Sequence, residues 1–150
     1  MKIKDTDKGF LAIKKALLSL KKKEIKVGIH EGAGENAKTG TLIVDYAIAN
    51  EYGTSKIPER SFMRSTVDEK QQEWNKALDR IVGGIATGDV NNIEQKISFV
   101  AEQMVNDIKD KIDSNIPPPL SEATIKRKGS SKTLIDTGIM KTSITYKVEN

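Results

Sequence analysis

The 150-residue chain contains no cysteine and only one histidine, His30. Without cysteine it forms neither a disulfide nor a thiolate zinc site, and one histidine excludes any site that needs two. No apolar run approaches the ~20 residues of a membrane-spanning helix. The first ten residues, MKIKDTDKGF, are charged and lack the apolar segment of a secretory signal. We therefore expect a chain made in the cytoplasm, without membrane contact.

Charge is distributed unevenly along the chain. Residues 1–30 carry nine lysines and three acids, for a net charge of +6. Residues 31–115 carry ten basic and fifteen acidic groups, and residues 116–150 carry six basic and three acidic groups. Basic ends around an acidic middle weaken the case for a dedicated nucleic-acid-binding protein. They fit a protein whose copies meet one another or differently charged partners.

Two segments alternate between apolar and polar residues, which is the period of a half-buried β-strand. In residues 24–30 three aliphatic residues share one face, and His30 lies on the opposite, solvated face. Residues 144–148 alternate in the same way near the end of the chain. With the helices described next, they predict an α+β fold. It has a small, mainly antiparallel sheet packed against long helices in a single domain, residues 1–150.

Apolar residues spaced three and four apart predict two long helices in the middle of the chain. Thr66 and Glu69 have the spacing of a capping box at the start of the first helix, and the glycines at 83, 84 and 88 end it. Asp89 is expected to cap the second helix, residues 90–113. At ~1.5 Å per residue, that helix would be about 35 Å long.

The stretch LIDTGIM, residues 134–140, contains the Asp-Thr-Gly sequence of aspartic proteases. Such an enzyme needs two carboxylates that share a proton, and a symmetric dimer can supply the second. Only 12 residues follow Gly138, however, which is too few for the flap and further sheet of the retroviral type. We instead expect Asp136 and Thr137 to accept backbone N–H bonds where a short helical turn begins.

The stretch GAGENAKT, residues 32–39, follows a strand as a phosphate-binding loop does. Ala37 replaces the second glycine of that motif, and Gly40 interrupts the helix that would support a phosphate near Lys38. We expect a loop of small polar residues that binds no nucleotide. No pair of carboxylates has a spacing that suggests acid–base catalysis. No catalytic, cofactor-binding or metal-binding residue is therefore predicted, and the chain is not expected to be an enzyme.

Several short motifs follow one another in a characteristic order: VGIHE (27–31), AIANEYGT (47–54), IPERSFM (57–63), PPLSEATIKRKG (118–129) and LIDTGIMKTSITYKV (134–148). In this order the chain resembles the tail-completion and neck proteins of tailed bacteriophages, in both the Mu-type virion morphogenesis and the HK97 gene-10-like groups. The resemblance covers residues 25–64 and 117–148, and residues 65–116 match only as helices. Ser61 is a departure, because the family often has a second proline there.

The resemblance implies a virion protein at the head–tail interface, made in the bacterial host cytoplasm. Such proteins form a ring, usually a hexamer, as a tail-completion, neck or head–tail connector component. The implied partners are further copies, other neck, connector or tail-terminator proteins, and genomic DNA that passes through without sequence recognition. In this family the Asp-Thr-Gly stretch is a hinge before the last strand. The motif residues with an implied structural role are Glu51, Gly53, Pro58, Arg60, Phe62, Asp136 and Gly138.

The alternative function is a basic nucleic-acid-binding accessory protein of a phage or prophage, using Lys21–Lys23 or Lys126–Lys128. Neither basic run is interleaved with aromatic residues for base stacking, and no known DNA-binding motif is present. In a ring, one patch must meet a different patch on the neighbouring subunit. We predict that a basic segment, Lys21–Lys23 or the run of Lys126, Arg127 and Lys128, faces an acidic helix surface on the neighbour, formed by Asp107, Asp110 and Asp113.

Overall fold

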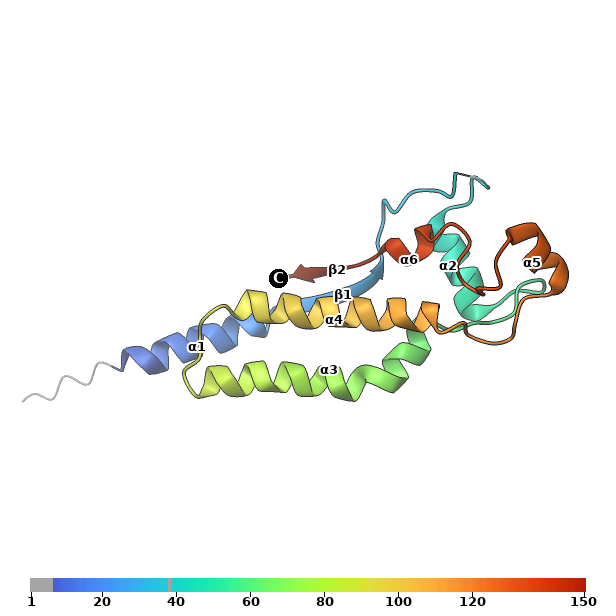
Figure 1. Ribbon diagram of the computed structural model, residues 1–150. Coiled ribbons are helices and arrows are strands. Elements are labelled where there is room, and N and C mark those ends of the chain that lie inside the picture. Colours follow the sequence, from blue (N-terminus) through green and yellow to red (C-terminus); the bar gives the residue numbers. More distant parts are fainter. Residues whose placement is uncertain (1–6, 38) are drawn as a thin grey trace, which may run out of the picture.

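Six helices and a two-stranded sheet form the fold over residues 7–37 and 39–150, the part that the computed structural model describes (Figure 1). Lys38, the lysine of the phosphate-loop comparison, lies outside the described residues. The elements follow the order α1 (Lys8–Leu20), β1 (Glu24–Ile29), α2 (Ile43–Tyr52), α3 (Met63–Ala86), α4 (Ile93–Asp113), α5 (Glu122–Lys128), α6 (Ile139–Thr142) and β2 (Ile144–Glu149). The predicted α+β class is confirmed.

The sheet pairs β1 with β2 in antiparallel orientation. Its register sets Val27 opposite Tyr146 and Ile29 opposite Ile144, so the apolar residues of both strands share one face. Helix α4 lies between this sheet and α3, which gives three layers (Figure 1). The two predicted strands and their common apolar face are confirmed.

The core is richest where α4 meets the sheet, α2 and α6. Helix α4 turns a continuous apolar face inward, because its aliphatic residues recur at three- and four-residue spacing. Phe62, Leu134 and Ile144 complete the core from other segments and are at most 2% exposed. The buried residues of α4 are Ile97, Val100, Ala101, Val105, Ile108 and Ile112.

Helix α3 differs from its predicted bounds at both ends. It begins at Met63, and the predicted capping box is wrong, because Thr66 is buried within the helix and donates to the Phe62 carbonyl at 2.6 Å. It continues through the glycines at 83–84 and ends at Ala86. A glycine in a helix costs about 1 kcal/mol relative to alanine. Packing of α3 on α4 and α1 outweighs that cost.

The start of α4 also differs from the prediction. The helix begins at Ile93, after Asn92 in a left-handed conformation with φ of 54°. Asp89 does not cap it, because its carboxylate pairs with Lys96 at 2.6 Å instead. His30 is likewise not the solvated residue expected, since its Nε2 atom is buried without a hydrogen-bond partner among the described residues. None of the helices in the described part of the chain combines the length and apolar character needed to cross a membrane.

Candidate functional site

The start of α3 is capped by a side chain from another helix. Glu51, in the last turn of α2, is 5% exposed and directs its carboxylate at the first N–H groups of α3. Oε2 accepts from the N–H groups of Phe62 at 2.8 Å and Met63 at 2.9 Å, and Oε1 accepts from that of Arg64 at 3.0 Å. The Ser61 hydroxyl donates to Oε1 at 2.8 Å. Because helix N-termini carry unpaired donors and partial positive charge, this contact ties α2 firmly to α3.

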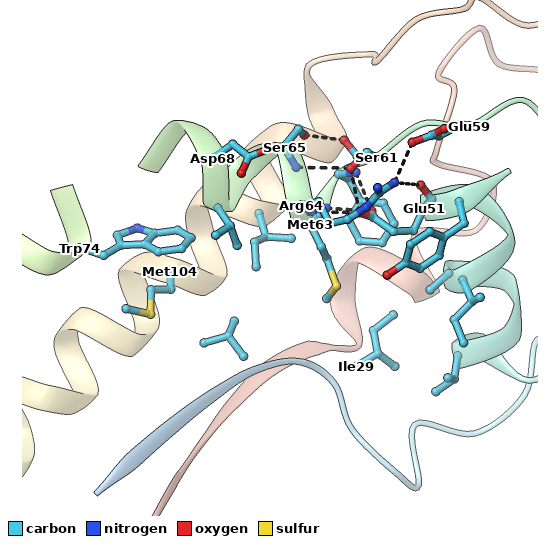
Figure 2. A pocket seen from close by; sticks show the side chains of 18 residues that line it. Ile29, Glu51, Glu59, Ser61, Met63, Arg64, Ser65, Asp68, Trp74 and Met104 are labelled. Carbon is cyan, nitrogen blue, oxygen red and sulfur yellow. Dashed lines mark hydrogen bonds and ion pairs between the residues drawn. The ribbon is translucent and has the colours of Figure 1, made fainter. Parts of the chain in front are cut away.

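Arg64 closes the other side of this carboxylate. Its Nε donates to Glu51 Oε1 at 3.1 Å, and its Nη2 donates to the Glu51 backbone carbonyl at 2.9 Å and to Glu59 at 2.7 Å. The guanidinium also lies 4.5 Å from the ring centre of Tyr52, in cation–π contact. We call Glu51, Glu59, Ser61 and Arg64 the Glu51 cluster (Figure 2).

Opposing influences set the pKa of Glu51. Burial is the largest of them and raises the pKa, because a buried carboxylate loses hydration. The hydrogen bonds from the backbone of residues 62–64 and from Ser61 together outweigh burial, so the pKa lies below its ordinary value. The carboxylate is therefore held in its charged form, as a helix cap requires.

Arg60 joins this region to the proline segment far along the chain. Arg60 is only 4% exposed. Its Nε and Nη2 atoms donate to the Pro118 carbonyl at 3.0 and 2.6 Å. Its backbone N–H donates to the Asn50 carbonyl at 2.7 Å. The two motif regions of the sequence, residues 47–63 and 118–148, thus make direct contact.

The turn between α2 and α3 depends on a glycine. Gly53 ends α2 with φ of 72°, and a Cβ atom placed there would lie 2.9 Å from the backbone nitrogen of Glu59. Pro58 is exposed in the same turn. Of the seven motif residues, Glu51, Gly53, Arg60 and Phe62 therefore meet at the α2–α3 junction.

Asp136 and Gly138 lie apart from that junction, at the start of α6. Gly138 has φ of 77°, and the Thr137 hydroxyl accepts the Ile139 N–H at 3.4 Å, as predicted for Thr137. Asp136 is exposed and accepts no backbone N–H from the described residues, so the prediction for it is wrong. The reason is that α6 begins at Ile139 and Gly138 holds the capping position, which leaves Asp136 two residues too far from the helix.

Replacing Asp136 should therefore change little. We expect both Asp136→Asn and Asp136→Ala to alter the free energy of unfolding by less than about 0.5 kcal/mol, as surface substitutions usually do. Denaturant unfolding followed by circular dichroism measures this. A cost above 1 kcal/mol for alanine, restored by asparagine, would return Asp136 to a capping role. Peptide cleavage lost in Asp136→Asn would contradict its assignment as a turn residue.

An open groove of about 860 Å³ adjoins the Glu51 cluster (Figure 2). Apolar side chains from β1, α2, α3 and α4 make up most of its lining, among them Ile29, Met63 and Met104. The polar groups of the Glu51 cluster are bonded to one another rather than left free. A small-molecule site usually keeps a few free polar groups that orient its ligand. The groove thus has the chemistry of an apolar docking surface, and we call it the α2–α3 groove.

Two of the three acids predicted for an interface serve the chain itself. Asp107 accepts the indole N–H of Trp74 at 2.7 Å, and Asp113 pairs with Lys141. Asp110 is exposed on α4, and its carboxylate has no hydrogen bond or ion pair within the described residues.

The basic residues divide in a similar way. Lys126 and Arg127 are exposed on α5, whereas Lys128 is half-buried and donates to the Lys132 carbonyl at 2.6 Å. Burial lowers the pKa of Lys128. In the other basic run, Lys23 pairs with Glu94 at 3.1 Å, and its side chain is only 13% exposed. The lysines at 21–22 are exposed.

Sequence reasoning did not find Arg64, Glu59 or the groove, although one signal was present. The buried positions of α2 include Ile43, Ala47 and Glu51, which recur every four residues along one helical face. A glutamate on an otherwise apolar face predicts a buried carboxylate with a dedicated partner.

Neither a metal site nor a family match accompanies this geometry. Over residues 7–37 and 39–150, no group of three or more His, Cys, Asp or Glu side chains is placed to hold a metal ion. Comparisons with family models, with curated proteins and with solved structures found no match to the chain.

Proposed function

We propose that the chain is a structural protein of the head–tail junction of a tailed bacteriophage. It forms a ring, usually of six copies, that completes the tail or joins it to the head. It acts as a building block rather than as an enzyme, and genomic DNA passes through the ring without being read. The order of motifs in the sequence suggests this class of protein, and the structure of the α2–α3 junction supports an architectural role.

The observation that carries the proposal is that the motif residues at the α2–α3 junction have structural roles. Glu51 caps α3, Gly53 permits the turn, Arg60 holds the proline segment and Phe62 fills the core. Three of these motif residues position backbone, Phe62 packs in the core, and the charged ones are already bonded within the chain. A motif with this chemistry supports an architectural role in an assembly, where the shape of each subunit has to be fixed.

Electron microscopy and native mass measurement test the proposal together. The purified protein is expected to give a discrete oligomer that appears as a ring with a central channel. Particles from a phage lacking this gene should accumulate as separate heads and tails. Joined particles in the absence of the gene would overturn the proposal. Tight DNA binding by the monomer, falling steeply with salt, would favour the nucleic-acid-binding alternative.

Because Asp107 and Asp113 are bonded within the chain, the predicted charge-complementary contact reduces to Lys126 and Arg127 of one copy and Asp110 of its neighbour. We expect Lys126→Glu with Arg127→Glu to reduce assembly while the monomer stays folded, because charge governs orientation and association rate. Adding Asp110→Lys to the same chain should partly restore assembly. The effect should be modest, since each exposed ion pair contributes about 0–1 kcal/mol.

A matched control keeps the net charge change equal. Lys76→Glu with Lys147→Glu reverses two lysines that are also exposed, on α3 and β2. Sedimentation across a range of salt concentrations measures the oligomer fraction of each variant. If the α5 reversal assembles as well as this control, the predicted contact is wrong, and the basic segment faces the channel or solvent.

A further inference from the structure

Helix α1 leaves much of its apolar surface unburied. It packs on α3, and its Ala16 is buried at 8% exposed. Four larger apolar residues stay open to solvent: Phe10 at 60%, Leu11 at 64%, Leu17 at 37% and Leu18 at 56% exposed. We call these four residues the α1 stripe. Large exposed apolar patches on a protein mark surfaces that bind a partner.

The spacing of the α1 stripe places its four residues on one side of the helix. Its residues form two neighbouring pairs, 10–11 and 17–18, that lie seven residues apart and hence on the same side of the helix. At ~1.5 Å per residue the whole helix is about 20 Å long. Around the helix axis Lys14 and Lys21 fall between the two members of each pair. Along the axis Lys14 lies between the two pairs and Lys21 follows the second pair, directly after α1, so positive charge lies on the same side of the helix as the stripe.

The α2–α3 groove has the complementary character. Its mouth exposes Ile48 at 51%, Tyr52 at 60% and Val67 at 42%, which are unusual exposures for such residues so close together. The charged residues that line it carry a net negative charge. Three are acidic and one is basic: Glu51, Glu59, Asp68 and Arg64.

The α1 stripe and the groove are separate surfaces of the molecule. Helix α1 extends away from the end that carries α2 and α5 (Figure 1). The groove runs from α2 to the middle of α3 and α4, at Trp74 and Met104, and no α1 residue lines it. A single copy therefore presents both a cationic apolar helix and an anionic apolar groove.

We propose that the α1 stripe of one copy binds in the α2–α3 groove of a second copy. The apolar side chains supply affinity, and the lysines of α1 meet the acidic rim formed by Glu59 and Asp68. The contact joins two different patches, so it repeats from copy to copy and closes into a ring when the rotation allows. The inference rests on the proposed function only in that copies of the chain assemble.

The absence of cysteine from the chain allows a direct test by cross-linking. Leu18→Cys on one protein and Ile48→Cys on a second, differently tagged protein are mixed and mildly oxidised. Because contact raises the effective concentration of the two thiols, we expect at least about tenfold more mixed disulfide than from a control pair. The control pairs Leu18→Cys with Phe99→Cys, since Phe99 is 70% exposed on α4 and lies outside the groove.

A second measurement uses charge on the stripe itself. Leu11→Lys with Leu18→Lys should reduce the oligomer fraction at least about tenfold by native mass, because lysine ammonium groups resist burial. The helical circular dichroism should stay unchanged, because both residues are more than half exposed. Phe99→Lys with Val82→Lys makes the same change at exposed residues outside both surfaces and should leave the oligomer intact.

The outcomes separate this inference from the proposed function. Rings that persist in the stripe variant, with cross-linking at the control level, overturn the inference and leave the ring proposal standing. A wild-type protein that is monomeric and a cysteine pair that forms no mixed disulfide would also overturn the inference. The joining of heads to tails would then test the proposed function by itself. If Ile48→Cys cross-links a different phage protein and not α1, the groove binds that protein and the inference is wrong. If the mixed disulfide forms but phage assembly proceeds without this protein, the inference stands and the proposed function is wrong.

Discussion

Replacing Glu51 by alanine is expected to lower the free energy of unfolding by about 2–3 kcal/mol, the upper part of the range for leaving a buried donor without its acceptor. The substitution leaves three N–H groups at the start of α3 without their acceptor. It also removes the carboxylate that Arg64 and Ser61 contact. Denaturant unfolding followed by circular dichroism gives the free energy directly.

Two further variants separate the effect of the buried Glu51 cap from that of losing any glutamate near a helix start. Glu94→Ala removes a glutamate from the first turn of α4, but the Glu94 side chain is 83% exposed and pairs only with Lys23. It should cost no more than about 1 kcal/mol. Glu51→Gln keeps one acceptor oxygen and should fall between the two alanine variants. If Glu51→Ala costs no more than Glu94→Ala, the carboxylate does not hold α3 in place.

The same carboxylate gives stability a defined pH dependence. The pKa of Glu51 is lower in the folded chain than its ordinary value of 4.5, so the unfolded chain takes up the proton first as pH falls. Its contribution is complete above about pH 4.5 and is lost as the pH falls through the lower folded pKa. The difference in stability between wild type and Glu51→Gln should therefore shrink in that acid range.

The sequence predicts the sheet well because the information is local. Alternating apolar residues in β1 and β2 define which face of each strand is turned inward. The register that places Val27 opposite Tyr146 does not follow from this alternation, because a shift of two residues keeps the same face inward. The short helix α5 is similar, since the Ser121 hydroxyl accepts the Thr124 N–H and Gly129 ends the helix. Caps within a few residues of their helix are visible in the sequence.

The start of α3 escapes prediction because its cap is not local. Thr66 and Glu69 offer a capping box, yet Glu51 reaches Met63 from another helix and sets an earlier start. Asp107 escapes for a similar reason, because its partner Trp74 lies 33 residues earlier in the chain. Polar residues on helix faces look solvated until tertiary structure supplies the second group.

Helix α1 marks a different limit of sequence reasoning. Its apolar spacing predicts a buried face. The pattern does not show whether that face is buried within the same chain or against another one. Ala16 packs within the chain, whereas Phe10 and Leu18 are left open. An amphipathic pattern wider than the contact available inside the chain is what an interface helix requires.

Replacing Gly53 by alanine is expected to lower the free energy of unfolding by about 3 kcal/mol, from two separate causes. With φ of 72° and ψ of 171°, Gly53 lies in a region of backbone conformation that is essentially restricted to glycine, and an L-residue held there costs about 1–3 kcal/mol. The new Cβ would also lie 2.9 Å from the Glu59 backbone nitrogen, and overpacking of this kind costs about 1–3 kcal/mol. The contacted atom belongs to backbone, so relief would have to move the turn that leads into the Glu51 cluster.

Gly129→Ala is the control, because Gly129 also has φ of 72°, at the end of α5, but its ψ of 15° gives it the left-handed helical conformation. A Cβ there meets nothing within 4 Å among the described residues, so only the conformational cost of about 1–2 kcal/mol remains. The difference between the two variants measures the combined cost of the Gly53 backbone conformation and of packing in the α2–α3 turn. Equal losses in denaturant unfolding would mean that the turn yields freely. The junction of Glu51, Arg60 and Phe62 would then be less rigid than a fixed subunit shape requires.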